Sequence, residues 1–149
     1  MERKDFKFIH ISDIHIGREI TKKYSFLDLN QETRVRRSPI KVLDNLVTLA
    51  EEEQVDFILL AGDTFDDDMP SSDNYFKKFQ YFLRKLDQLN IDIYIVLGNH
   101  DVASDLLKSF ESKKLPGNTY VFPAKNADTF IIDNFKVAIH GQSYPKKVV

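Results

Sequence analysis

The sequence contains no cysteine among its 149 residues. Disulfide bonds, zinc–thiolate sites and cysteine nucleophiles are therefore excluded, and any metal must be held by Asp, Glu, His, Asn or backbone oxygen. Tryptophan is also absent, whereas phenylalanine occurs 12 times. We therefore expect the aromatic part of the core to consist mainly of Phe.

The sequence also lacks an apolar run long enough to cross a membrane. Its first ten residues, MERKDFKFIH, are too charged for a signal peptide. We therefore expect a cytoplasmic protein without a membrane partner. The net charge of −2 does not point to nucleic acid, although a nearly neutral chain can still carry a local basic face. The length fits one domain with a real core.

The hydrophobic pattern predicts alternating strands and helices. Apolar runs predict strands at 6–12, 55–61 and 91–97, and helical spacing predicts helices at 39–54 and 74–89. A short helix is expected at 103–110, with short strands at 119–122, 129–133 and 136–140 and a hairpin turn at Asp133-Asn134. The order β-α-β-α-β followed by strands predicts an α/β fold that begins with a parallel sheet.

Residues 17–38 show no helical period and are rich in charge, so we expect a long basic loop there. Ser38 followed by Pro39 is typical of a helix start. Arg18, Arg36 and Arg37 in this segment are candidates for contact with a DNA backbone. A solvated loop without a ligand is at least as good an interpretation.

Polar residues follow each of the first three predicted strands. Asp13 and His15 follow the first, Gly62-Asp63-Thr64-Phe65-Asp66 follows the second, and Gly98-Asn99-His100-Asp101 follows the third. Parallel strands bring their carboxyl ends to one sheet edge, where ligands bind. Two residues apart on an extended chain, Asp13 and His15 should point the same way. Gly62 and Gly98 would permit the tight turns before the polar residues.

These residue types suit a metal centre. Carboxylate and amide oxygens mixed with imidazole fit Mn, Fe or Zn better than Ca or Mg. A carboxylate such as Asp63 can bridge two cations, which can clamp a phosphate and activate water. Each motif alone is weak, because an isolated Asp-x-His or Gly-Asp is most often an ordinary turn. All three motifs in this order, each closing a strand, make coincidence a poor explanation.

The three motifs together resemble those of the calcineurin-like metallophosphoesterases, Asp-x-His, Gly-Asp-x-x-Asp and Gly-Asn-His-Asp/Glu. The stretches DIHIG and VDFILLAGDTFD look like those of SbcD-type exonuclease subunits and their double-strand-break-repair counterparts. This resemblance implies a metallophosphoesterase β-sandwich flanked by helices, of which this chain would supply the N-terminal βαβαβ half plus a few strands. It also implies that the protein binds two divalent cations. Mn is the expected metal, and Fe, Zn and Mg are the alternatives.

The resemblance also implies a role for each matching residue. Asp13 and His15 would hold the first metal, Asp63 would bridge both metals and Asn99 would bind the second. His100 would protonate or stabilise the leaving oxygen, and Asp101 would orient His100. Asp66, which ends the second motif, is expected to shape its loop.

The chain departs from the family pattern at its C-terminal end. The family supplies three further histidines, whereas this chain contains only His10, His15, His100 and His140. His10 is expected to be a core or sheet-face residue, and His140 to be a ligand only as the minor alternative. We therefore interpret residues 1–149 as a single, C-terminally incomplete metallophosphoesterase domain that is inactive on its own.

The leading hypothesis is a Mn-dependent DNA exonuclease or endonuclease subunit that acts in DNA repair. The alternatives are a generic metallophosphoesterase acting on nucleotides or phosphoproteins, and a non-catalytic scaffold with this fold. DNA is the expected partner of the parent protein. A coiled-coil ATPase and a second copy of the chain are further expected partners that rest on the resemblance.

Overall fold

The computed structural model describes residues 5–18, 27–66, 73–103 and 115–145. Their elements run in the order β1 (Phe8–Ile11), α1 (Leu29–Glu52), β2 (Phe57–Ala61), α2 (Asp73–Gln88), β3 (Asp92–Val96), α3 (Asn99–Ala103), β4 (Thr119–Val121), β5 (Asp128–Ile132) and β6 (Val137–Gly141). Among these residues, no helix is both long enough and apolar enough to span a membrane.

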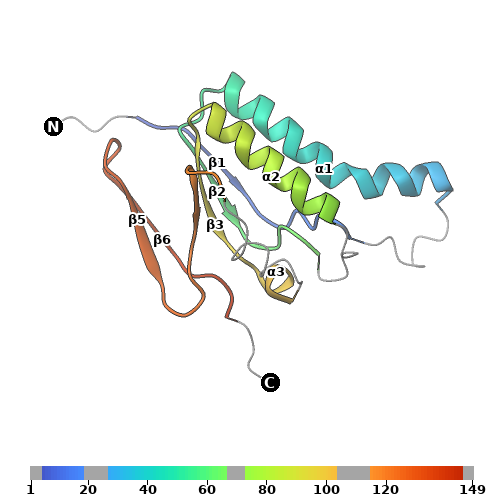
Figure 1. Ribbon diagram of the computed structural model, residues 1–149. Coiled ribbons are helices and arrows are strands. Elements are labelled where there is room, and N and C mark those ends of the chain that lie inside the picture. The colour runs from blue at the N-terminus through green and yellow to red at the C-terminus, as the bar shows by residue number, and fades with distance from the viewer. Residues whose placement is uncertain (1–4, 19–26, 67–72, 104–114, 146–149) are drawn as a thin grey trace.

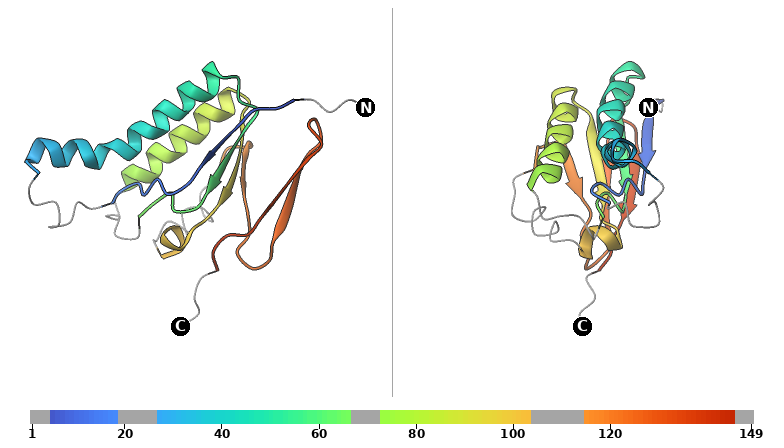
Figure 2. Two further views of the ribbon diagram at one scale, coloured as in Figure 1. Left: turned by 180° about the vertical axis from the view of Figure 1, so that it is seen from behind. Right: turned by 90° about the vertical axis from the view of Figure 1, so that its right-hand side faces the viewer.

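Four strands form a parallel sheet in the order β1-β2-β3-β4. Strands β5 and β6 pair antiparallel as a separate hairpin, as the sequence predicts. Helices α1 and α2 lie side by side on one face of the sheet, and the hairpin lies on the other (Figures 1 and 2). The expected α/β fold with a parallel sheet is therefore confirmed.

Two hydrophobic clusters hold these layers together. The larger lies between the sheet and the two helices, and includes the predicted α2 residues Phe76, Phe79, Leu83 and Leu86. The smaller lies on the hairpin side around Phe57, Tyr94 and Phe122. All of its aromatic rings belong to Phe or Tyr, since the chain contains no Trp. The two clusters fix β2 and β3 from both faces, and these strands carry the loops of the candidate site.

The prediction of a loop at 17–38 is wrong for its second half, because α1 begins at Leu29. Asp28 caps this helix: its carboxylate accepts the backbone N–H groups of Asn30 and Gln31, both at 2.8 Å. The Gln31 side chain in turn accepts the Asp28 N–H at 3.0 Å. This reciprocal pair is a capping box. Residues 19–26 of the predicted loop lie outside the described residues.

Pro39 lies inside α1 rather than in its first turn. Proline has no N–H, so the carbonyl four residues earlier loses its usual helical donor. Here that carbonyl belongs to Val35, and the Ser38 hydroxyl donates to it at 2.7 Å. In the sequence Ser38-Pro39 resembles a helix start. In the structure it lies within one helix, where the Ser38 hydroxyl replaces the hydrogen-bond donor that Pro39 lacks. The helix changes direction part-way along, and its first half projects beyond the sheet (Figures 1 and 2).

The short helix expected at 103–110 starts earlier. Helix α3 spans Asn99–Ala103 and begins directly in the third motif. The rest of the predicted segment, 104–110, lies outside the described residues. Since α3 follows β3 at the carboxyl edge of the sheet, it carries Asn99 and His100 to that edge (Figure 1).

Candidate metal centre

The loops after β1 and β2 continue the pairing of their strands. Asp13 N–H donates to Gly62 O at 3.1 Å, and His15 N–H donates to Asp63 O at 3.0 Å. Further along, Ile16 forms a parallel bridge with Phe65. The first two motifs are therefore held side by side by backbone hydrogen bonds, not only by their side chains.

Asp13, His15 and Asp63 all have left-handed backbones, with φ of 56°, 49° and 51°. Such conformations cost roughly 1–2 kcal/mol per non-glycine residue, and they cluster at functional sites. The extended geometry expected for Asp13 and His15 is therefore wrong. Their side chains are brought together by two left-handed turns instead of by strand alternation.

The Asp63 carboxylate depends on the absence of a side chain at Gly98. A Cβ on Gly98 would overlap Asp63 Oδ1 and would lie 2.5 Å from the Asp63 backbone nitrogen. The same Oδ1 accepts the His100 backbone N–H at 3.2 Å. The second and third motifs are therefore packed directly against each other, and α3 is held to the Asp63 side chain.

One ligand atom from each of Asp13, His15 and Asp63 lies within 4.8 Å of the others. Two carboxylates and one imidazole at this separation fit a divalent transition metal by donor chemistry. Asn99 adds an amide beside Asp63, since both line an open cavity of about 470 Å³. The residues present therefore suit the cation site that the sequence predicts, and the predicted convergence at one sheet edge is confirmed for Asp13, His15 and Asp63.

The same cavity reaches the segment that follows β6. Its lining includes Gln142, Ser143 and Tyr144 opposite Asp63 and Asn99. Tyr144 N–H donates to Leu97 O at 2.8 Å. The buried Ser143 hydroxyl accepts the Leu97 N–H at 2.9 Å and donates to the Phe122 carbonyl. The sequence alone does not indicate that Gln142, Ser143 and Tyr144 lie at the site, because none of them is an acid or a histidine.

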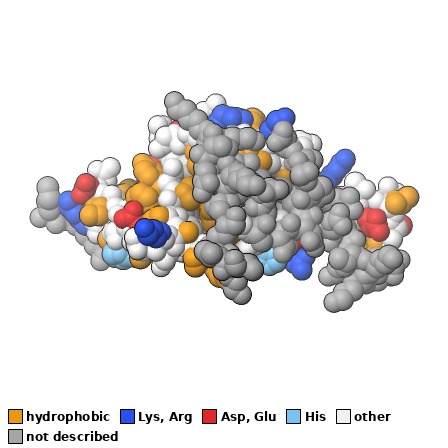
Figure 3. All heavy atoms as spheres, turned by 60° about the horizontal axis from the view of Figure 1, so that its bottom comes forward, with side chains coloured by type: hydrophobic (Ala, Val, Ile, Leu, Met, Phe, Trp, Pro, Cys, Tyr) orange, Lys and Arg blue, Asp and Glu red, His pale blue; other side chains and the backbone are white. Residues whose placement is uncertain are grey.

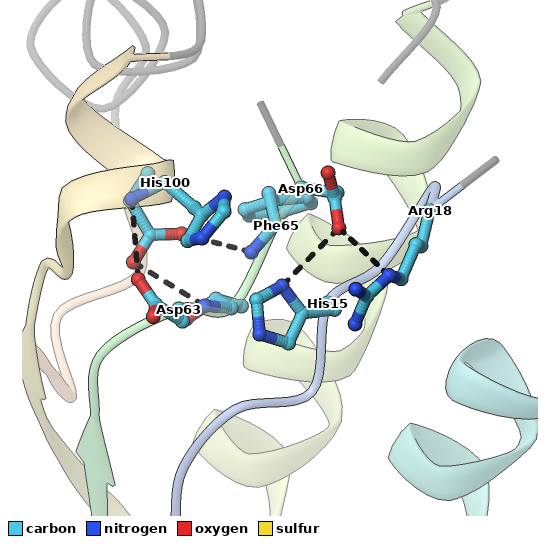
Figure 4. Close-up of polar contacts among 8 residues, drawn as sticks. His15, Arg18, Asp63, Phe65, Asp66 and His100 are labelled. Carbon is cyan, nitrogen blue, oxygen red and sulfur yellow. Dashed lines mark hydrogen bonds and ion pairs between the residues drawn. The ribbon is translucent and has the colours of Figure 1, made fainter. Parts of the chain in front are cut away.

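A second group of side chains lies around Asp66, which is 5% exposed. Asp66 Oδ2 lies 3.2 Å from His15 Nδ1 and 3.7 Å from Arg18 Nε. The His15 and His100 rings meet edge to face with centroids 4.9 Å apart. Figure 4 shows His15 between Asp63 and Arg18, with Asp66 above it. Asp66 thus does more than shape its loop, which the motif alone did not indicate.

Asp101 is 1% exposed and ties two motifs together. Its carboxylate accepts the backbone N–H groups of Phe65 and Gly98 at 2.8 Å, and that of Thr64 at 3.3 Å. Burial raises the pKa of Asp101, and these backbone hydrogen bonds oppose the rise only in part. Through these contacts Asp101 links the loops of the second and third motifs. That Asp101 also orients His100 stays a prediction.

The predicted basic contacts are separated in space. Arg18 reaches the site and is 70% exposed. Arg37 instead lines a different cavity between α1 and α2, together with Tyr75 and Lys78. The side chain of Arg36 is outside the described residues. From Leu29 onward the predicted basic loop is replaced by α1, and among the predicted basic contacts whose side chains the structure describes, Arg18 lies beside the candidate ligands and Arg37 does not.

The other two histidines lie elsewhere in the fold. His10 is exposed on β1, as expected for a sheet-face residue. His140 is exposed on β6, where its Nδ1 lies 2.8 Å from the Thr129 hydroxyl. Within the described part of the chain, His140 belongs to neither group of potential metal ligands. In the space-filling view of Figure 3, histidine, acidic and basic side chains lie scattered among hydrophobic ones on the face in view.

Comparison with known proteins decides the family. Residues 6–146 match the family model described as calcineurin-like phosphoesterase. The chain belongs to this family. The match covers all three motifs and almost the whole chain, so the resemblance drawn from the motifs is confirmed at the level of the family.

Two curated relatives are each 30% identical to the chain. One is "Uncharacterized metallophosphoesterase YhaO" of Bacillus subtilis, over 97% of this chain. The other is "DNA double-strand break repair protein Mre11" of Methanococcus maripaludis, over 93% of this chain. The chain spans 35% of the length of each relative. The activity and partners of a whole protein are therefore matters for proposal.

A solved structure supports the fold. A dimetal phosphatase from Danio rerio aligns with a TM-score of 0.50 and 21% identity, over 74% of this chain and 34% of that protein. The chain therefore has the metallophosphoesterase α/β fold, with a parallel sheet of four strands and an antiparallel pair. Family membership makes phosphoester hydrolysis the expected chemistry, and the family generally binds two divalent metals.

Proposed function

We propose that this chain is the N-terminal part of a Mn-dependent phosphodiesterase that cleaves DNA during repair. One observation carries the proposal. The ligand atoms of Asp13, His15 and Asp63 lie within 4.8 Å of one another, and the His100 N–H donates to Asp63. Three strand ends thus contribute to one centre with the donors that a Mn-type cation prefers.

The residues that would hold the cations are Asp13, His15, Asp63 and Asn99, and the Asp63 carboxylate would be shared between the two proposed cations. When bound, such cations polarise the phosphate and lower the pKa of a bound water. Asp13 and Asp63 supply the negative charge that holds the cations, and Asn99 adds a neutral oxygen. The two left-handed turns and Gly98 fix these donors before any substrate arrives, so little reorganisation is needed on binding.

His100 is the proposed proton donor to the leaving oxygen. Its ring lies against the His15 ring, and its backbone is held on Asp63, so the imidazole stays beside the candidate cation site. A histidine titrates near neutrality and can donate a proton there. Asp101 keeps the Asp63 and His100 loops together through its backbone hydrogen bonds.

DNA is the proposed substrate because a relative at 30% identity is named a DNA double-strand break repair protein. Arg18, mostly exposed beside the site, is the proposed contact to a phosphate of the strand, and Arg36 and Arg37 stay proposed contacts. The coiled-coil ATPase partner and the homodimer rest on the resemblance alone, whereas the cytoplasmic location is proposed from the charged first ten residues and the absence of a long apolar run in the sequence. A generic phosphoesterase acting on nucleotides or phosphoproteins is the alternative.

The test uses a protein that carries this chain together with the sequence that follows Val149 in its gene. Mn-dependent hydrolysis is measured on single- and double-stranded DNA, on a bis-aryl phosphodiester and on an aryl phosphomonoester. The proposal expects cleavage of DNA and of the diester, both lost in Asp63→Ala. Hydrolysis of the monoester without cleavage of DNA would support the alternative. Asp133→Ala, in the exposed hairpin turn, is the control.

A further inference from the structure

We propose that Tyr144 is a specificity residue of the candidate site, whose ring stacks on the base of a nucleoside attached to the scissile phosphate. The inference deepens the proposed function and rests on it, because it names the class of phosphodiester that the site selects. The feature that carries it is the open cavity of about 470 Å³ that Tyr144 shares with Asp63 and Asn99.

The lining of this cavity combines two kinds of groups. Asp63 and Asn99, two of the proposed cation ligands, give it a polar part. An apolar and aromatic part is made by Val96, Leu97, Tyr144 and Pro145. Small-molecule sites commonly pair an apolar lining with a few polar groups that fix orientation. A phosphate that carries a flat ring matches both parts, with the phosphate at the proposed cation site and the ring against Tyr144.

Two glycines keep side chains out of the wall beside Asp63. A Cβ on Gly62 would lie 3.3 Å from Gly98 Cα, and a Cβ on Gly98 would overlap the Asp63 carboxylate. Both glycines also line the cavity. This part of the wall therefore consists of backbone, and glycine is the residue that allows a backbone to approach a ligand closely.

The chain around Tyr144 is anchored by hydrogen bonds of its own. Tyr144 N–H donates to Leu97 O at 2.8 Å, and Ser143 N–H donates to Pro123 O at 3.0 Å. The buried Ser143 hydroxyl accepts the Leu97 N–H. These bonds tie the segment after β6 to the end of β3, and Figures 1 and 2 show this segment and α3 at the same end of the molecule. The position of Tyr144 is therefore set before a ligand binds.

A purely structural role for Tyr144 is the rival interpretation. Tyr144 is 42% exposed, whereas Tyr94 in the core on the hairpin side is 5% exposed. The backbone bond from Tyr144 to Leu97 does not need the ring. Removal of the ring should therefore affect a ligand more than the fold. Replacement of a base-stacking aromatic ring by alanine typically weakens binding about 5- to 150-fold, whichever base is bound.

The first experiment uses the protein that carries this chain together with the sequence that follows Val149 in its gene. Thymidine 5′-p-nitrophenyl phosphate and methyl p-nitrophenyl phosphate share a leaving group and differ only in the group that stays on the phosphate. With Mn²⁺, Tyr144→Ala should raise KM for the thymidine ester about 5- to 150-fold, with kcat and the methyl ester unaffected. Tyr144→Phe keeps the ring and should behave like the wild type. Equal losses on both esters, or an unchanged KM, would overturn the proposal.

The second experiment measures contact with the base without any turnover. Saturation-transfer NMR of the same protein with thymidine 5′-monophosphate and Mg²⁺ reports which ligand protons touch the protein. The proposal expects strong transfer to the thymine methyl protons, lost in Tyr144→Ala and kept in Tyr144→Phe. Absence of transfer to the base in the wild type, or transfer that persists in Tyr144→Ala, contradicts it.

Tyr81→Ala is the matched control, because Tyr81 is 51% exposed but lies on α2 and does not line this cavity. It should match the wild type in both experiments. If the wild type hydrolyses neither ester, the proposed function fails, and the NMR measurement still decides whether Tyr144 contacts the base.

Discussion

Gly98 is the residue on which the position of the Asp63 carboxylate depends. Gly98→Ala should displace Asp63, because the new Cβ would overlap its Oδ1 and crowd its backbone nitrogen. Overpacking of this kind typically costs 1–3 kcal/mol. We expect a lower free energy of unfolding in urea and weaker Mn²⁺ binding, although no ligand has been removed.

Gly117→Ala is the control for this change, because a Cβ at Gly117 meets nothing within 4 Å. A surface substitution of this kind should alter stability by less than about 0.5 kcal/mol. Equal stability and Mn²⁺ affinity in the Gly98 and Gly117 variants would contradict the packing argument.

Tyr94 provides a pH-dependent test of the core on the hairpin side. Burial, followed by the neighbouring Asp92 charge, raises the pKa of Tyr94 from 10.0 to about 12. Because the folded state favours the protonated phenol, its contribution to stability is fully present below pH 10 and is lost as the pH rises through about 12. Tyrosinate absorbance should therefore show one late-ionising tyrosine.

Tyr94→Phe should remove that late ionisation and flatten the alkaline loss of stability. Tyr81→Phe, at a position that is 51% exposed, controls for loss of a tyrosine elsewhere. If the late absorbance phase persisted in Tyr94→Phe, the assignment to Tyr94 would be wrong.

At the scale of the elements, α1 shows where sequence patterns fail. Apolar spacing correctly placed its second half, which packs on the sheet through Leu43, Leu46 and Ala50. Its first half projects beyond the sheet, so no core face marks it in the sequence. The local signal was the Asp28–Gln31 capping box, which competed with the more familiar Ser38-Pro39 pair. The start of α1 is therefore marked in the sequence by its capping residues and not by a pattern of buried apolar residues.

Asp28→Ala tests that local signal. Loss of an N-cap acceptor costs about 0.5–2 kcal/mol, and because the first half of α1 has little packing, the loss should appear as fraying. Hydrogen exchange should accelerate for the amides of residues 30–38, and little for those of 43–52. Thr33→Ala, which removes only a hydroxyl bonded to Leu29 O, is the control. Unchanged exchange at 30–38 would show that the capping box is not needed.

The sequence predicted those parts of the candidate site that depend only on residue type and on the order of the strands. Asp13, His15 and Asp63 converge because parallel strands end at one edge, which the order of motifs already indicated. The left-handed backbones of Asp13, His15 and Asp63 were not predictable, since non-glycine residues adopt this conformation in only a few per cent of cases, even though Asp and His do so more often than most. Nor were the contacts of Asp66 and Asp101, because both depend on the register of two loops whose hydrogen bonds the sequence does not show.

At the scale of the whole molecule, we expect the 149-residue chain to be inactive on its own. The proposed first metal has three ligands from this chain, and the second has only Asp63 and Asn99. A weakly held second cation would not complete the pair that neutralises both reacting oxygens. An assay with added Mn²⁺ on DNA and on a bis-aryl phosphate should show no turnover. Turnover that Asp63→Ala abolishes would mean that other residues complete the site.

The central claim is that the carboxyl edge of the sheet holds a divalent cation. Calorimetric titration of the 149-residue chain with Mn²⁺ tests it most directly, with Asp63→Ala as the variant and Asp133→Ala as the control. The wild type and Asp133→Ala should bind at least one Mn²⁺ ion with the same affinity, and Asp63→Ala should lose that binding. Wild-type affinity in Asp63→Ala would contradict the account.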